Sequence, residues 1–172
     1  VALVLEWCEH GSLNQLLQEK HHCLTLLQCL QMASELAHSV YYLHSQDTPL
    51  AHPDLTSSNV YITIDFHVKL GGCFPKNVNH TNGYNNDASL EGNILSLAII
   101  LNQLLSRSSN DSNITLPSLN ELVISMKNSD PDLRPRINDV VRRVDGALKK
   151  LQSETFAAVD NMPSSIFETF WS

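Results

Sequence analysis

The chain has 172 residues, a length that suits one domain with a well-filled core. Its net charge of -7 argues against a nucleic-acid-binding surface, and no apolar run approaches the roughly 18 residues of a membrane-spanning helix. The four cysteines lack C-x-x-C spacing, so free thiols are expected rather than a zinc site: Cys8, Cys23, Cys29 and Cys73.

The chain starts at Val1 without a basic-then-apolar leader. We therefore expect no signal peptide, a cytoplasmic location and further chain upstream. The first predicted element is a short apolar strand over Val1–Leu5. A short amphipathic helix is expected to follow, with Ser12 as its N-cap and an apolar stripe that begins at Leu13 and continues through Leu16 and Leu17.

The strongest helical pattern runs from Leu24 to Ser45. Apolar residues recur there at spacings of three and four, and neither Gly nor Pro interrupts them. Thr25 lies near the predicted start. His38 and His44 fall on this helix, where we expect ordinary helix histidines rather than ligands.

A tight loop over Ala51–Asn59 leads into a predicted β-hairpin. Its strands are Val60–Ile64 and His67–Leu70, because Val, Ile and Tyr favour a pleated, half-buried surface. The turn is expected near Asp65 and Phe66.

Three further helices are expected over Leu90–Leu105, Leu119–Met126 and Ile137–Leu151. The first is apolar nearly all round, which predicts a central, buried position. The stretch Pro75–Ala88 lacks apolar periodicity and is rich in Asn, so it is predicted to be a loop. The tail carries aromatic residues that we expect to dock on the domain or on a partner: Phe156, Phe167, Phe170 and Trp171.

The loop before the hairpin has the order His52, Asp54, Leu55, Asn59, which resembles the H-R-D-L-x-x-x-N catalytic loop of protein kinases. The hairpin ends where a kinase has its D-F-G triplet, and here the triplet reads Gly72-Cys73-Phe74. The resemblance implies a mainly α fold: a kinase C-terminal lobe with one small hairpin, and an N-terminal lobe that is absent or truncated. It covers residues 1–150 as hinge and C-lobe and leaves 151–172 as a tail.

The resemblance also implies site residues. Asp54 takes the position of the catalytic base and Asn59 that of a metal ligand. An alternative for both is structural, because Asp and Asn in tight loops commonly cap their own backbone. The adenine pocket would be formed by the gatekeeper, the hinge and the residue beneath the ring: Leu5, Glu6, Trp7, Cys8 and Tyr61.

Three departures from the family pattern point to an inactive member. Gly72 has no carboxylate for the metal that bridges the nucleotide phosphates, Pro53 replaces the Arg of H-R-D, and Thr56 replaces the catalytic-loop Lys. We expect no metal and no required cofactor, only a vestigial ATP and Mg²⁺ site. Tyr61 is expected to intrude on the space that adenine needs.

Two more family positions are changed or lack a partner. Asn93 replaces an Asp at the start of the apolar helix, although an amide can still bond the catalytic-loop backbone. Arg134, in D-P-D-L-R-P, has no predicted partner unless Glu91 supplies one. The favoured hypothesis is a pseudokinase that binds or scaffolds other proteins, with no nucleic-acid or membrane partner. The alternative is the C-lobe of an active serine/threonine kinase.

Overall fold

The computed structural model describes residues 4–19, 23–73, 88–108 and 117–160. Its helices are α1 (Leu13–Gln18), α2 (Leu26–His44), α3 (Leu90–Arg107), α4 (Pro117–Met126) and α5 (Ile137–Asp160), with a short 3-10 turn, η1, over Pro131–Leu133. Strands β1 (Val60–Ile62) and β2 (Val68–Leu70) form a two-stranded sheet. These elements confirm the predicted fold class, a mainly helical unit with one small hairpin.

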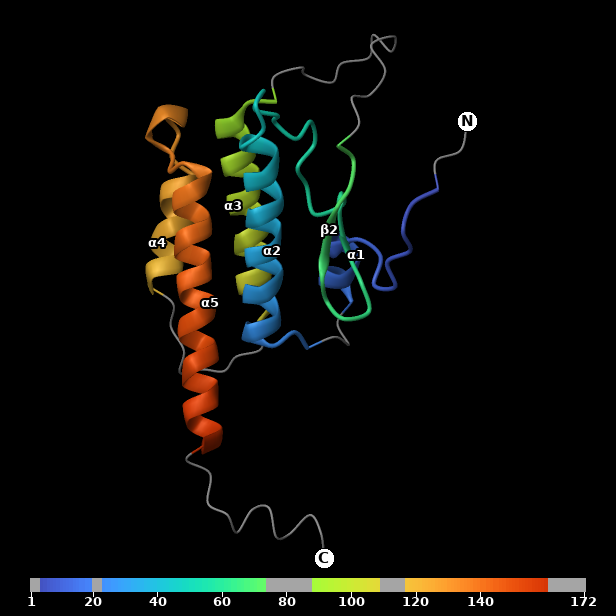
Figure 1. The fold of residues 1–172 in the computed structure, drawn as a ribbon, viewed down its shortest axis with the longest axis vertical. Coiled ribbons are helices and arrows are strands. Elements are labelled where there is room, and N and C mark those ends of the chain that lie inside the picture. The colour runs from blue at the N-terminus through green and yellow to red at the C-terminus, as the bar shows by residue number, and fades with distance from the viewer. Residues whose placement is uncertain (1–3, 20–22, 74–87, 109–116, 161–172) are drawn as a thin grey trace, which may run out of the picture.

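Helix α2 lies at the centre of the arrangement. It packs against α3 and α5, while β2 contacts its other side and α1 contacts β1 (Figure 1). The two long apolar helices, α2 and α3, thus pack directly against each other. The hairpin therefore lies against one side of a helical layer. The loop before it, Ala51–Asn59, lies near the top of that layer in Figure 1.

Local sequence explains where α1 and α2 begin. Ser12 and Gln15 form a capping box at α1, and Thr25 and Gln28 form a second at α2. In each box the hydroxyl accepts from the backbone N–H three residues on, which satisfies a donor that the helix leaves open. Helix α2 then ends at Ser45.

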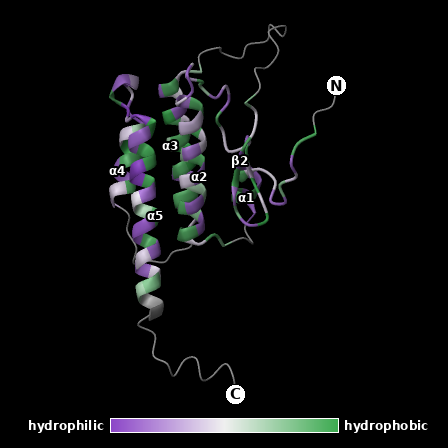
Figure 2. Cartoon of the chain, in the orientation of Figure 1, coloured by the Kyte–Doolittle hydropathy of each residue, from purple (hydrophilic) through white to green (hydrophobic). Residues whose placement is uncertain are grey.

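Helices α2 and α3 supply much of the core. Both carry long hydrophobic stripes, and the hydrophobic colouring of α3 is nearly continuous (Figure 2). Leu97 and Leu104 of α3 are fully buried, as are Leu30 and Leu36 of α2. Helix α3 is not buried on every side, because Ile99 is 49% exposed.

The hairpin is shorter than predicted, with Val60 opposite Leu70 and Ile62 opposite Val68. A three-residue loop closes it, because the backbone N–H of Thr63 donates to His67 O at 3.0 Å. Phe66 occupies the last loop position with φ 62°. Such loops place a left-handed residue there, usually Gly, so Phe66 carries backbone strain.

Two predicted boundaries were wrong. Val4 and Leu5 lie in no strand, because the described part of the chain gives them no strand to pair with, and residues 1–3 of that prediction lie outside it. Helix α5 does not end at Leu151 but continues to Asp160, because no Gly or Pro lies between these two residues to stop it. Phe156 on this extension is 72% exposed.

Two further predictions fall largely outside the described ranges. They are the loop Pro75–Ala88, of which only Ala88 is described, and the tail aromatics after residue 160. Among the described residues, no helix combines the length and the apolarity needed to cross a membrane.

Candidate functional site

His52 is the buried centre of the loop that precedes the hairpin. Its Nδ1 accepts from the backbone N–H of Asp54 at 3.1 Å, and its Nε2 lies 2.8 Å from the carbonyl oxygen of Gly71. Because Nδ1 is the acceptor, the ring proton is on Nε2 and is donated to Gly71. The imidazole is thus neutral and ties the loop to the end of β2.

Asn93, in the first turn of α3, anchors the same loop through two hydrogen bonds. Its Oδ1 accepts from the backbone N–H of His52 at 2.6 Å, and its Nδ2 donates to His52 O at 2.9 Å. This pair of bonds confirms that an amide can replace the family's Asp in anchoring the loop. His44 Nε2 lies 3.3 Å from the same Oδ1. Burial lowers the pKa of His44, against the opposing effects of Asn93 and Glu91.

Asp54 and Asn59, the predicted base and metal ligand, lie side by side. The Asn59 amide donates to Asp54 Oδ2 at 2.9 Å and to the Asp54 carbonyl oxygen at 2.7 Å. The second bond is the backbone-capping role that the sequence left open as an alternative. The amide nitrogen is therefore engaged in holding the loop closed around Asp54.

Gly72 lies next to Asn59, at the position where a kinase has its metal-binding Asp. A Cβ at Gly72 would lie 3.2 Å from Asn59 Oδ1, and the residue has φ 76°. The left-handed conformation is free for Gly and disfavoured for other residues. Among the described residues, no group of three or more His, Cys, Asp or Glu side chains is arranged to hold a metal ion.

A cavity of about 820 Å³ lies between the N-terminal segment and the hairpin, and we call it the hinge pocket. All five residues predicted for the adenine pocket line it: Leu5, Glu6, Trp7, Cys8 and Tyr61. The structure brings them together with residues that the sequence analysis did not select, including Gln15, Ser39, Val68 and Lys69. Strand alternation could have indicated Lys69, because it pairs with Tyr61 and shares its face.

The stretch Glu6–Gly11, which we call the hinge segment, is held in place by backbone pairing with β1. The His10 N–H donates to Ile62 O at 3.1 Å, and the Ile62 N–H donates to Gly11 O at 2.9 Å. The ring of His10 also stacks on Phe66 with centroids 4.6 Å apart. On the far side of the pocket, Lys69 Nζ lies 3.2 Å from Glu6 Oε2.

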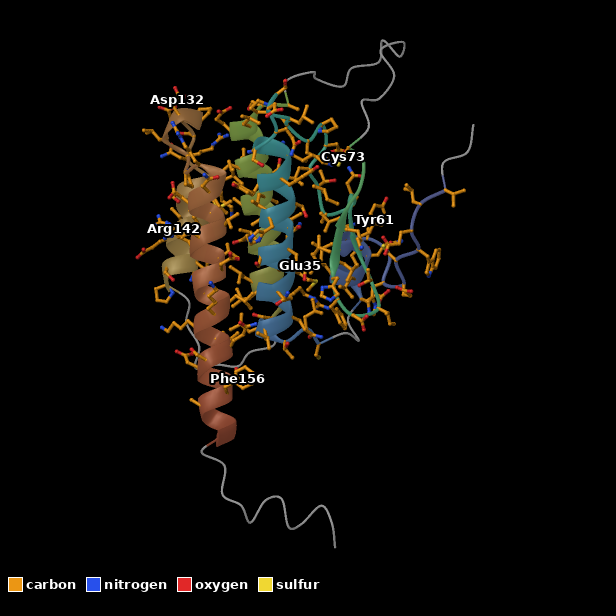
Figure 3. All side chains as sticks on the ribbon, in the orientation of Figure 1. Glu35, Tyr61, Cys73, Asp132, Arg142 and Phe156 are labelled. Atoms are coloured by element: carbon orange, nitrogen blue, oxygen red, sulfur yellow. The ribbon has the colours of Figure 1, made fainter. Side chains whose placement is uncertain are left out.

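Tyr61 lines the hinge pocket, and its ring lies against Gly71, another residue of the pocket lining. The two are so close that a Cβ at Gly71 would be 2.7 Å from Tyr61 Cε2. Because Gly71 has no side chain, the Tyr61 ring fits against its backbone. That Tyr61 intrudes on the space that adenine needs stays a prediction. Figure 3 shows Tyr61 on the hairpin, next to the hinge segment.

Glu35, on the face of α2 turned toward the hairpin, was not predicted as a structural contact (Figure 3). Its carboxylate accepts from the Val68 N–H at 2.7 Å and bonds His67 Nδ1 at 2.7 Å. Burial acts to raise the pKa of Glu35, but these bonds and one from Gln31 outweigh it and lower the pKa. No sequence signal would have indicated the contact of Glu35 with the hairpin, because a Glu four residues after Gln31 is typical of an exposed helix surface.

Arg134 donates hydrogen bonds to backbone carbonyl groups rather than to a carboxylate. Its Nη1 donates to the carbonyl oxygen of Glu91, and its Nε donates to that of Asn128, both at 2.9 Å. Glu91 therefore does meet Arg134, through its main chain.

The thiols of Cys8 and Cys73 have pKa values raised by burial, which keeps them protonated and weakly nucleophilic.

A family profile described as "Protein tyrosine and serine/threonine kinase" matches residues 1–103. The chain is 36% identical over 72 residues to receptor-interacting serine/threonine-protein kinase 2 of Bos taurus, covering 41% of this chain and 13% of that protein. It is 35% identical over 71 residues to the human mixed lineage kinase domain-like protein, covering 41% and 15%. It is 41% identical over 69 residues to human receptor-interacting serine/threonine-protein kinase 3, covering 40% and 13%. The matched part thus spans only a small share of these relatives' length.

Proposed function

Because the chain belongs to the protein tyrosine and serine/threonine kinase family, we propose that it is a catalytically impaired member that acts by binding a partner protein. Phosphoryl transfer depends on positioning and on charge stabilisation by metal ions. The proposal rests on one observation: Gly72 has no carboxylate, and the described side chain nearest to it is that of Asn59, whose amide nitrogen is already committed to Asp54. A metal ion there would find no D-F-G carboxylate.

The hydrogen-bonded loop around Gly72 is intact, which favours a binding role over a loss of all function. Asn93 and His52 still fix the loop, and His52 still reaches the end of β2. A rigid kinase-like surface without its charge-stabilising groups can present a fixed shape to another protein. We also propose a cytoplasmic location, supported by the four thiols, none of which the structure pairs in a disulfide.

An active serine/threonine kinase lobe is the second candidate. It is favoured by the proximity of Asp54 and Asn59 and by relatives named as serine/threonine-protein kinases. Another relative is named only as kinase domain-like. Family membership is compatible with both candidates, so the chemistry at Gly72, Pro53 and Thr56 decides between them.

The deciding experiment is a phosphoryl-transfer assay on the longest natural chain that contains these residues. Radiolabelled ATP is supplied with Mg²⁺ or Mn²⁺, a generic protein substrate, and the Asp54→Ala variant as control. We expect no transfer above the Asp54→Ala background. ATP-dependent labelling that Asp54→Ala abolishes would revive the active-kinase candidate.

Partner binding is tested separately, with a photo-crosslinking residue placed at Trp7 in the parent protein. Trp7 is 79% exposed beside the hinge pocket, and Ile124, 71% exposed on α4, serves as the matched control position. We expect a discrete crosslinked protein from the Trp7 position, but not from the Ile124 position, and we expect it to persist in the Asp54→Ala variant. A crosslink that disappears in Asp54→Ala would indicate a substrate of catalysis rather than a scaffolded partner.

A further inference from the structure

We infer that a pocket at the end of the helical layer where α3 and α5 begin binds a partner protein through a carboxylate side chain that has aliphatic neighbours. The inference rests on the proposed function, since it names the chemistry of a partner. The pocket has a volume of about 460 Å³, within the range of ligand sites, and shares no lining residue with the hinge pocket. We call it the arginine pocket, after Arg134 and Arg136, which both line it.

Part of the lining of the arginine pocket is apolar. Ile94 of α3 and Ile137 of α5 line it and are buried members of the core. Leu90, in the first turn of α3, lines it as well and is only half-buried. An aliphatic side chain placed here would remove further apolar surface from water, which favours binding.

Arg134 presents a fixed guanidinium group to the pocket. Its Nε and Nη1 donate to the backbone carbonyl oxygens of Asn128 and Glu91, both at 2.9 Å. Its Nη2 has no hydrogen-bond partner among the described residues. A guanidinium that is already held in one orientation loses little freedom on binding, and its remaining N–H groups suit carboxylate oxygens.

Arg136 brings a second positive charge to the same pocket. None of the ion pairs within the described ranges includes Arg134 or Arg136. Glu91 and Asp132 also line the pocket, outside ion-pair distance of either arginine. Burial lowers the pKa of His44, so this lining residue is neutral at pH 7. A carboxylate is therefore favoured over a phosphate, whose second charge the two acidic residues would repel.

The ends of three helices meet at the arginine pocket. Figure 1 shows the start of α3, the start of α5 and the end of α2 at the same end of the helical layer, and Asp132, labelled in Figure 3, lies there too. The first residues of α3 and α5 line the pocket. Two helix N-termini contribute partial positive charge against one C-terminus, so the backbone adds to the preference for an anion that the arginines establish.

The full chain is titrated by isothermal titration calorimetry with the capped peptide acetyl-Ser-Leu-Glu-Leu-Ser-amide and with the same peptide carrying Gln in place of Glu. The Glu peptide is expected to bind with a dissociation constant of roughly 1 mM or lower. The Gln peptide should bind about tenfold more weakly, because a neutral amide cannot form charge-assisted hydrogen bonds with the arginines. This comparison needs no variant of the protein.

Arg136→Gln is expected to remove most of the difference between the two peptides. Arg136 is exposed, so this variant should fold. Arg142→Gln is the matched control, because the Arg142 side chain is 77% exposed, pairs with Asp139 and does not line the pocket. Its affinity for the Glu peptide should equal that of the wild type.

The apolar contact is tested at Leu90. Leu90→Ala should weaken both peptides by a similar factor, because the aliphatic neighbours are the same in each. Leu133→Ala, at a position 66% exposed and outside the pocket lining, should weaken neither. Equal effects of the two variants would show that the leucines of the peptide bind elsewhere and would contradict the inference.

Equal affinities of the Glu and Gln peptides, or no binding of either at several millimolar, would overturn the inference. A phosphoserine peptide that binds more tightly than the Glu peptide would overturn the preference for carboxylate. Equal losses in Arg136→Gln and Arg142→Gln would indicate general charge attraction in place of a site. The titrations contain no nucleotide, so they are read independently of catalysis. A failed titration beside a persistent Trp7 crosslink refutes this inference alone, and phosphoryl transfer by the parent protein refutes the proposed function.

Discussion

At the scale of single residues, the positions that match functional residues of the kinase family make structural contacts in this protein. Asn59 closes the loop onto Asp54, and Asn93 clamps His52 through both of its amide groups. Gly72 keeps a left-handed backbone beside Asn59. Each of these roles depends on the particular atoms present, so each can be tested by one substitution.

Gly72→Asp is expected to restore divalent-cation binding. It would place a carboxylate next to Asn59 Oδ1, where oxygen ligands suit Mg²⁺ and Mn²⁺. The left-handed backbone should destabilise the variant by about 1–2 kcal/mol. We expect Mn²⁺ to raise the melting temperature of Gly72→Asp. Gly72→Ala carries the same strain without the carboxylate and should not respond. An equal response of the two variants would show that the cation binds elsewhere.

Asn93→Asp, which restores the family residue, is expected to destabilise this protein. A carboxylate oxygen would face the His52 carbonyl oxygen that now accepts from Nδ2 at 2.9 Å, in a site only 4% exposed. Loss of this buried bond should cost about 1–3 kcal/mol at pH 7. The loss should shrink in acid, because a protonated carboxyl can donate again. Denaturant melts at pH 7 and pH 4 measure both effects, and equal stability at pH 7 would contradict the geometry.

Glu35 should make stability depend on pH in the acid range. Its pKa in the folded protein is lowered below the ordinary value of 4.5, so the unfolded chain takes up the proton first as pH falls. The stabilisation is therefore complete above pH 4.5 and is lost as pH falls through the folded-state pKa. Glu35→Gln should be less stable than wild type by about 1 kcal/mol at pH 7, and the difference should narrow toward pH 3. A difference independent of pH would assign the contact to packing alone.

At the scale of elements, the sequence predicted those whose signals are local. The N-cap residue Ser12 and the three-four periodicity located α1 and α2 to within two residues at each start, because both signals lie within one or two turns of the helix. The contact of Glu35 with the hairpin was missed, because it depends on how α2 and β2 meet. The contact between the Tyr61 ring and Gly71 was missed for a similar reason: a cross-strand fit is visible only in three dimensions.

The core between α2 and α3 is expected to account for much of the stability. Leu97 is fully buried, so Leu97→Ala should lower the free energy of unfolding by about 2–5 kcal/mol. Ile99→Ala, two residues on and 49% exposed, is the matched control and should lose clearly less. Urea denaturation of both variants provides the measurement. A loss below about 1 kcal/mol at Leu97 would place it outside the core.

At the scale of the whole molecule, the described elements divide into a helical layer and a flank that carries the site. The layer of α2, α3, α4 and α5 is joined by apolar packing. The flank, with the hinge segment and hairpin, joins the same core through Val60 and Ile62, and hydrogen bonds from Glu35 and Asn93 tie it to α2 and α3.

The pairing of the hinge segment with β1 has a consequence for the order of folding. His10 and Ile62 are 52 positions apart in the chain, and α2 lies between them, so their bond can close only after α2 and the hairpin exist. By the same reasoning, this contact should open before the helical layer does. Native-state hydrogen exchange should then show the His10 amide exchanging faster than amides in the middle of α2, such as that of Leu36. The hinge pocket would assemble last and open first. A ligand that binds there should therefore slow amide exchange at His10 and leave the exchange rates of amides in α2 unchanged.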